Sequence, residues 1–444
     1  MIDYTYIDIQ NPWWRQKEAI MQDEKILEFE RLTYQHWPNN VLDLPVFPGA
    51  IHVITGLRQT GKSTAIKLYI RKLILDGFDP KHIFHFNCDA LASQKDLTDL
   101  LIEFDRLSTK TLQTVVFLDE ISAVENWALA IKWLADSGIL KNKTLFLTGS
   151  SSINLKRGGE LMPGRRGLGQ DIIFHPLNFW EYCHLVGKAS ARIKLSASQK
   201  TIDSLREIDT GVKLHWKKFI KTGGILRNIN YGVNEQTNDL YLKTLKSELY
   251  KFGKKEDSLR EVIRKILASL TAQTSYVNIA EEAELGSKNT AIEYLGFLTD
   301  SYFVSEAKFW DINQDKPILK KNKKFYTTDP YILWLFSSFV SGELDFSRLE
   351  GIFDESKLVE NFIASEISKS GLRFYFYQNS HEIDFYLPSQ KLGIEVKYKP
   401  KIISSDLIGL APAKTKLLIS KNTLEVRDEV LIVPVHLFSW IDLG

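Results

Sequence analysis

The chain has 444 residues, and its 57 Lys and Arg against 55 Asp and Glu give a formal net charge of +2. Apolar residues make up 44% and charged residues 25%, which excludes a largely disordered, collagenous or coiled-coil chain. The near-neutral balance also excludes a polycation, so any nucleic-acid binding must come from a local basic surface. At about 150 residues per domain, this length predicts roughly three domains.

The number of cysteines and the lengths of the apolar runs indicate the cellular compartment in which the protein is expected. Cys88 and Cys183 are the only cysteines, which excludes a disulfide framework, argues against a cysteine-built zinc site and fits a reducing cytosol. Residues 1–14 show neither the basic segment nor the apolar core of a secretory signal. The most apolar stretch, 331–340, is shorter than the roughly 18 residues of a membrane span. We therefore expect a soluble, cytoplasmic protein without a membrane partner.

The first half of the chain alternates helical and strand-like segments. Residues 16–34 show a helical pattern, which Pro38, Pro45 and Pro48 end. Unbroken apolar strands that alternate with helices predict a parallel sheet buried on both faces. Five short runs of mainly β-branched and aromatic residues have this character: 51–55, 82–87, 114–118, 144–148 and 171–176.

A phosphate-binding loop follows the first apolar run. Residues 56–63 match G-x-x-x-x-G-K-[ST], after a strand-like run and before a helical one, a context that argues against a chance match. Backbone N–H groups of such a loop can hold a pyrophosphate at a helix N-terminus. Lys62 would reach the β- and γ-phosphates, and Ser63 would bind Mg²⁺. We predict that the nucleotide is bound by Gly56, Arg58, Gln59, Thr60, Gly61, Lys62, Ser63 and Thr64.

Two acids end the third apolar run. Asp119 would hold Mg²⁺, and Glu120 would polarise the attacking water, because ligands bind at the carboxyl ends of strands in open α/β sheets. Without a phosphate-binding loop earlier in the chain, such an acidic pair would more simply be a surface pair that caps a helix. Thr148, at the end of the fourth run, either contacts the γ-phosphate or belongs to a Ser/Gly turn through Ser151, and the pattern leaves both readings open. The run 82–87 lies between the two nucleotide motifs in the sequence.

These motifs together resemble a known family. Over residues 45–310 the chain is similar to the archaeal and bacterial AAA+-type ATP-binding proteins, in the loop GLRQTGKS, the strand end LTGSS and the segment 176–181, PLNFWE. The resemblance implies an arginine finger, Arg165 or Arg166, that reaches the ATP of a neighbouring subunit. It therefore implies a homo-oligomer, with a hexameric ring as one possible form. A surface loop with two arginines is the alternative.

One further turn matches this family in part. Gly223-Gly224 resembles its G-G-x-P turn, although Leu226 replaces the proline. Arg227 beside it is a weak candidate for a nucleotide sensor.

Residues 258–304 predict the helices of a winged helix. Gly286 stands where the turn needs a small residue, and Ser287 is a fitting N-cap for the recognition helix, which would also present Lys288 and Asn289. The wing would follow, with 320–324, KKNKK, as a basic loop between its strands. Winged helices bind DNA or protein, and both remain open. The predicted core consists of Ile279, Ala283, Ala291, Leu295 and Leu298.

The C-terminal part carries a carboxylate motif. Asp384 lies on the strand-like run 382–387, and Glu395 and Lys397 share one face of the next run because strand side chains alternate. Glu360 lies on an upstream helix, 356–368. Two acids and a lysine that converge can bind Mg²⁺ and activate water against a phosphodiester.

The pattern resembles the PD-(D/E)xK nuclease fold and the DUF4143 domain that accompanies these ATPases. The resemblance implies that Asp384 and Glu395 bind the metal and that Glu360 completes its shell, directly or through water. Lys397 would position the water or neutralise the transition state. Ile383 replaces a proline that is frequent before the aspartate. The alternative is a nuclease-like fold kept for structure or DNA binding only.

The expected fold is α/β: a P-loop ASCE/AAA+ parallel-sheet core with a helical lid, a winged helix and a C-terminal restriction-endonuclease-like domain. The expected function is an ATP-hydrolysing machine that remodels duplex or branched DNA, with Mg²⁺-dependent cleavage as an open addition; the alternative is an ATP-controlled oligomeric signalling or defence switch. The partners that we expect are ATP, Mg²⁺, DNA and further copies of the chain. The domain boundaries that we expect are 1–44, 45–190, 191–255, 256–325 and 326–444, for the N-terminal helical segment, ATPase core, lid, winged helix and nuclease-like domain.

Overall fold

The computed structural model describes residues 4–108, 112–149, 162, 164–188 and 190–444. It consists of two compact units, Met1–His175 and Pro176–Gly444. Among the described helices, none combines the length and the apolar character that a membrane span requires.

Unit 1 is built on one parallel sheet. Its strands lie in the order β2-β3-β4-β1-β5, and all neighbouring pairs are parallel. They coincide with the five predicted apolar runs, so the predicted parallel α/β core is confirmed. In the sheet, β4 lies between β1 and β3, while β2 lies at the edge. The strands are β1 (Ile51–Thr55), β2 (Ile83–Asn87), β3 (Thr114–Asp119), β4 (Lys143–Thr148) and β5 (Asp171–Ile173).

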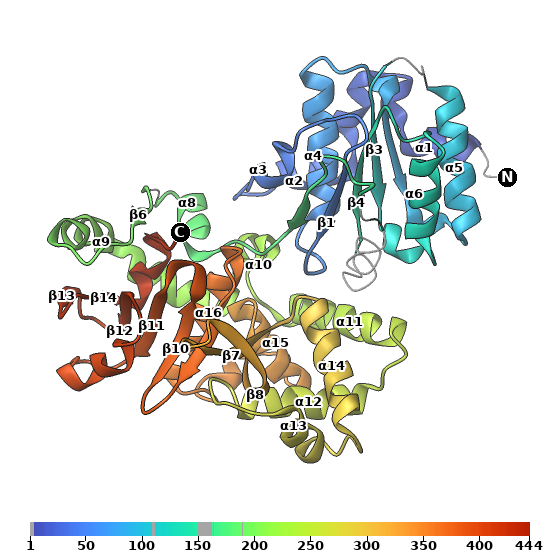
Figure 1. Cartoon of the computed structure of the whole chain (residues 1–444). Helices are drawn as coiled ribbons and strands as arrows, with labels where there is room; N and C mark the ends of the chain where they lie inside the picture. The colour runs from blue at the N-terminus through green and yellow to red at the C-terminus, as the bar shows by residue number, and fades with distance from the viewer. Residues whose placement is uncertain (1–3, 109–111, 150–161, 163, 189) are drawn as a thin grey trace. The chain divides into compact units, whose positions relative to one another are not determined.

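Helices cover both faces of this sheet (Figure 1). On one face, Phe117 packs with α4 (Lys62–Leu75); on the other, Leu118 packs with α5 (Gln94–Leu107) and α6 (Trp127–Asp136). Successive strand residues point to opposite faces of the sheet, so an unbroken apolar strand contributes side chains to the hydrophobic cores on both faces.

The predicted helix over 16–34 is shorter and interrupted. Residues Lys17–Gln22 form the 3₁₀ helix η2, and α2 spans only Glu24–Glu30. The break lies at Asp23, whose side chain accepts the backbone N–H of Lys25 at 3.0 Å and starts a new helix as its N-cap. The other short N-terminal helices are α1 (Tyr4–Gln10), η1 (Pro12–Trp14) and α3 (Asn39–Leu42).

The first part of unit 2 is mainly helical, as the pattern over 191–255 predicted. The strand β6 (Ile193–Lys194) pairs in parallel with β15 (Ile441–Asp442), close to the C-terminus. The helices are α8 (Phe179–Leu185), α9 (Gln199–Thr222), α10 (Leu226–Tyr231) and α11 (Glu235–Lys251).

Three helices and a hairpin follow, as expected for a winged helix. Gly286 has a φ of +71°, and the Ser287 hydroxyl caps the third helix by accepting the N–H of Thr290 at 3.1 Å. The five predicted core residues are all buried. The elements are α12 (Glu256–Ala268), α13 (Tyr276–Glu282), α14 (Lys288–Asp300), β7 (Val304–Asp311) and β8 (Lys316–Thr327).

The prediction of a basic loop at 320–324 is wrong. These residues lie inside β8, and the turn of the hairpin is at 312–315. Consecutive lysines are typical of loops because they avoid burial, but here two of them, Lys323 and Lys324, are buried by partners from distant parts of the chain.

A bulge explains how a strand accommodates these lysines. The pairing register of β7 and β8 shifts, and residues 319–322 lie outside it. The Lys323 ammonium holds the bulge from inside by donating to the carbonyls of Leu319 and Lys321, both at 2.7 Å. Lys320 and Lys321 are therefore displayed to solvent.

The C-terminal strands and the hairpin form one mixed sheet of order β13-β14-β12-β11-β10-β9-β7-β8. The hairpin joins it through a parallel pairing of β7 with β9 at Phe309 and Phe376. The buried helix α15 (Pro330–Ser341) and α16 (Glu355–Lys369) precede these strands. The strands are β9 (Tyr375–Gln378), β10 (Glu382–Leu387), β11 (Leu392–Lys397), β12 (Thr415–Ser420), β13 (Glu425–Arg427) and β14 (Val430–Pro434).

Candidate functional site

The phosphate loop connects the end of β1 with the start of α4. Gly56, Gln59 and Gly61 have φ values of +143°, +59° and +106°, a tight path that only small or polar residues adopt readily. The Lys62 ammonium turns back into the loop and donates to the carbonyls of Gly56 at 3.0 Å and Leu57 at 2.9 Å. The loop therefore has the shape and the cation that a triphosphate requires.

The predicted acids and Thr148 meet at the same edge of the sheet. The Thr148 hydroxyl donates to Asp119 Oδ1, and the Glu120 N–H donates to the same oxygen at 3.2 Å. Glu120 has a φ of +54°, a left-handed backbone that is costly for this residue and typical of functional positions. The neighbouring Ser150 and Ser151 lie outside the described residues. Because β4 lies beside both β1 and β3, it brings Thr148 between the two nucleotide motifs.

The residues at this edge fit a magnesium ion that accompanies ATP. Ser63, the second residue of α4, offers a hydroxyl oxygen, and Asp119, the last residue of β3, offers a carboxylate. Mg²⁺ prefers oxygen ligands, with one or two carboxylates and phosphate oxygens of the nucleotide. Bound in this way, the ion would neutralise charge on the phosphates; the roles of Ser63 and Asp119 stay predictions.

Both candidate arginines lie near the opposite edge of the sheet. The Arg166 carbonyl accepts the N–H of Ile51, the first residue of β1, and its guanidinium pairs with Asp171 at 2.7 Å. Arg165 pairs with Asp136 at 2.7 Å. The five residues of β1 extend about 17 Å, so Arg166 is held well away from the phosphate loop of its own subunit.

The glycine pair at 223–224 has a packing role. A Cβ atom at Gly223 would lie 1.8 Å from Asp329 Oδ1, and one at Gly224 would lie 1.8 Å from the carbonyl oxygen of Leu177. The Gly224 N–H donates to Asp329 at 2.9 Å. These contacts account for both glycines without a nucleotide, and Arg227 lies exposed on α10.

The winged helix presents several lysines. Lys288, at the start of α14, and Lys320 and Lys321, in the bulge, are exposed. Burial, with a smaller contribution from the positive charges of Lys288 and Lys308, lowers the pKa of Lys323 although the negative charge of Glu306 acts in the opposite direction. Because the net charge of the whole chain is near neutral, these exposed lysines form a local basic surface and not part of a generally basic protein.

In the C-terminal sheet, Asp384 and Glu395 lie on adjacent antiparallel strands, as predicted. The Asp384 N–H donates to Glu395 Oε2 at 3.4 Å, and the Val396 N–H donates to Asp384 Oδ2 at 2.9 Å. Lys397 forms an ion pair with Glu395. The motif residues therefore converge, and they do so largely by contacting each other.

Glu360 joins this cluster through a residue that the sequence reasoning missed. Lys324 of β8 is buried, and its ammonium lies 3.2 Å from Glu360, 3.2 Å from Asp384 and 2.5 Å from Glu382. The Tyr326 hydroxyl also donates to Glu360, at 2.6 Å. The only signal in the sequence was the alternation K-x-Y at the end of β8, which puts both side chains on one face.

Burial controls the protonation of the cluster. Burial, followed by the negative charge of Asp384, raises the pKa of Glu360 and the pKa of Glu395 to about 8. Burial alone would lower the pKa of Lys324, but the surrounding acids raise it well above its ordinary value. Lys324 therefore stays charged at neutral pH.

The carboxylates of this cluster do not fit a divalent cation as they are arranged. A charged lysine stands between Glu360 and Asp384, two of the three predicted ligands. Within the described part of the chain, no three His, Cys, Asp or Glu side chains are placed to hold a metal ion. The expected metal site at Glu360, Asp384 and Glu395 is thus at odds with the geometry.

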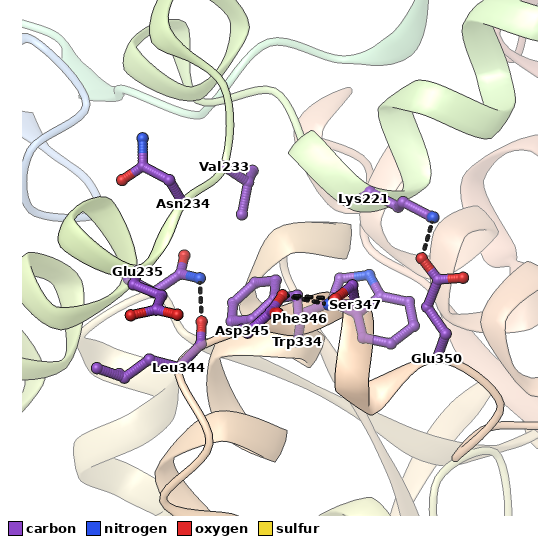
Figure 2. A pocket seen from close by; sticks show the side chains of 11 residues that line it. Lys221, Val233, Asn234, Glu235, Trp334, Leu344, Asp345, Phe346, Ser347 and Glu350 are labelled. Carbon is purple, nitrogen blue, oxygen red and sulfur yellow. Dashed lines mark hydrogen bonds and ion pairs between the residues drawn. The ribbon is translucent and has the colours of Figure 1, made fainter.

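Figure 2 shows a cavity of about 200 Å³ elsewhere in unit 2. Trp334 and Phe346 line it, and an ion pair between Lys221 and Glu350 lies beside them. None of the predicted site residues lines this cavity. Its other lining residues are Val233, Asn234, Glu235, Asn238, Leu344, Asp345 and Ser347.

Three family models match the chain. Residues 49–183 match an AAA domain, 226–338 match a domain of unknown function (DUF8612), and 355–437 match a domain of unknown function (DUF4143). The chain thus combines an AAA-type P-loop ATPase domain with a C-terminal DUF4143 domain, which confirms the resemblance seen in the sequence.

Two proteins that are named only as uncharacterized are similar to this chain. One from Methanocaldococcus jannaschii is 25% identical over 370 residues, which cover 79% of this chain and 74% of that protein. One from Haemophilus influenzae is 25% identical over 293 residues, covering 63% and 67%. Among solved structures, the Aeropyrum pernix ORC1 protein in complex with DNA is 11% identical, with 77% of this chain and 98% of that chain covered. The TM-score between the two structures is 0.29.

Proposed function

We propose that the chain binds ATP with Mg²⁺ at the phosphate loop and hydrolyses it. The observation that carries this proposal is the meeting of Lys62, Asp119, Glu120 and Thr148 at one edge of a parallel sheet. Lys62 would stabilise negative charge on the transferred phosphoryl group, and Glu120 would orient the attacking water. Thr148 positions Asp119 through its hydroxyl.

Two variants test this assignment. Lys62→Ala should abolish ATP binding or turnover. Glu120→Gln should still bind ATP but lose hydrolysis, because the glutamine amide has a shape similar to that of the carboxylate and is a poor base. Glu125→Gln changes an exposed acid five residues further along the chain; it is the control and should leave turnover unchanged. Wild-type turnover in both Lys62→Ala and Glu120→Gln would exclude this site.

We further propose that Arg165 or Arg166 acts on the ATP of a neighbouring copy, so the active form is a homo-oligomer. Their distance from the phosphate loop of the same subunit supports action in trans. The guanidinium of Arg165 is about one-third exposed, and it pairs with the half-exposed Asp136 at 2.7 Å. Light scattering with and without ATP tests assembly. A strict monomer, with normal turnover in an Arg165→Ala, Arg166→Ala double variant, would contradict the proposal.

ATP turnover is proposed to serve action on DNA, with the winged helix as the contact. The supporting observation is that Lys288, at the start of the recognition helix, and Lys320 and Lys321, in the bulge, are all exposed. Phosphate contacts of this kind release counterions, so affinity should fall linearly with the logarithm of salt concentration.

A double variant separates DNA binding from protein binding. Lys320→Gln with Lys321→Gln should reduce the salt slope by about 2, because each phosphate contact contributes about 0.9. Lys316→Gln, an exposed lysine at the start of β8, is the matched control. Failure of the wild-type chain to bind duplex or branched DNA at low salt would favour the oligomeric switch, in which this surface binds protein.

A further inference from the structure

The carboxylate cluster in the C-terminal sheet contains its own cation. Lys324 enters from the winged-helix hairpin, with only 2% of its side chain exposed, and lies within 3.2 Å of Glu360, Asp384 and Glu382. The ammonium donates hydrogen bonds to Glu360 and Asp384, and it also forms an ion pair with Glu382. The position between Glu360 and Asp384 is where their shared metal would have to lie.

These acids also have other partners within the chain. The Glu360 oxygen that faces Lys324, Oε1, also accepts the Tyr326 hydroxyl, and the second oxygen of Asp384 accepts the Val396 N–H. Glu395 pairs with Lys397. A Mg²⁺ ion requires near-octahedral oxygen ligands at about 2.1 Å, so it would have to displace several of these bonds.

Displacing Lys324 would itself be costly. Lys324 is buried, so an ammonium that lost these carboxylate partners inside the protein would be an unpaired buried charge, which is far more costly than an exposed one. A cation beside an ammonium that stayed would be repelled by it at short range. Lys324 and a divalent cation are therefore mutually exclusive at this cluster.

We propose that Lys324 is the resident cation of the Glu360–Asp384 cluster, that it excludes divalent metal ions from the native chain, and that its removal uncovers a metal site. The cluster then connects the winged-helix strand β8 with α16 and β10 through ion pairs and hydrogen bonds. This inference does not depend on ATP hydrolysis or on DNA binding.

The experiment is a titration of the full chain with Mn²⁺, in which free Mn²⁺ is followed by electron paramagnetic resonance. The wild type and an Asp384→Asn variant should bind the same amount, because the native cluster takes up no metal. Lys324→Ala should bind one additional Mn²⁺ per chain, and this ion should be lost in Lys324→Ala combined with Asp384→Asn. Lys323→Ala removes the adjacent lysine, which contacts carbonyls rather than carboxylates, and should behave as the wild type.

Two results would overturn the proposal. One is a wild-type chain that binds one more Mn²⁺ than Asp384→Asn, since metal then enters despite Lys324. The other is a folded Lys324→Ala variant that binds no additional Mn²⁺. Thermal unfolding provides a second readout, because Mn²⁺ should raise the midpoint of Lys324→Ala and leave that of the wild type unchanged. If Lys324→Ala does not fold, Lys324→Gln replaces it, and the comparison of wild type with Asp384→Asn still decides whether the native cluster binds metal.

Discussion

Replacing Gly56 by alanine tests whether the phosphate loop has the single shape that its function needs. A Cβ atom at this position would lie 2.2 Å from the carbonyl oxygen of Phe174, whereas ordinary contact begins at 3.4 Å. The loop or Phe174 must therefore move by about 1.2 Å, the difference between the two distances. Phe174 cannot yield freely, because its N–H donates to the Thr55 carbonyl at 2.7 Å. The loop is the part that shifts.

A shift of this size moves the backbone N–H groups that would hold the phosphates. Misplacement of about 1 Å costs roughly 100-fold in rate when groups must be aligned, and we expect a similar loss in ATP affinity, about 2.7 kcal/mol. The assay is equilibrium titration with a fluorescent ATP analogue, with circular dichroism to show that the variant is folded.

Gly77→Ala is the matched control, since Gly77 also has a positive φ, +90°, but has open space around its Cβ position. It should cost about 1 kcal/mol in stability and leave ATP affinity unchanged. ATP affinity of folded Gly56→Ala within about threefold of the wild type would refute the reasoning.

Three further predictions concern unit 2. Ser287→Ala removes the cap on the Thr290 N–H and should lower the free energy of unfolding by about 1 kcal/mol in urea titrations; no change would mean that the cap is dispensable. Lys369→Met leaves the fully buried Asp329 without its cation and should cost about 3–5 kcal/mol by the same measurement, which a loss below 1 kcal/mol would contradict. Burial raises the pKa of Glu366, so the folded state holds that proton to higher pH than the unfolded state. Its contribution to stability is present below pH 4.5 and is lost as pH rises through the folded pKa; Glu366→Gln should flatten this dependence, and an unchanged pH profile would exclude Glu366 as its source.

Local patterns predicted the winged helix well up to the end of its last helix. The Gly286–Ser287 turn and the apolar spacing of α13 and α14 depend on neighbours within a few residues, which a sequence displays directly. The hairpin was predicted less well. Lys323 donates to carbonyls within its bulge at 319–322, whereas the acids that surround Lys324 lie far away in the sequence. Partners distant in sequence leave no local pattern.

The sequence by itself determined the parallel ATPase core, the phosphate loop and the acids at the end of β3, because each depends on short-range spacing and on strand ends that meet at one edge of a parallel sheet. Only the tertiary structure decided the state of the C-terminal carboxylates. Lys324 lies 36 residues from Glu360 and 60 from Asp384 in the chain, and it meets them because the winged-helix hairpin continues the C-terminal sheet. A group of acids can be neutralised by a metal ion or by a lysine, and the outcome depends on which group the fold places between them. The spacing of residues within one motif does not contain that information.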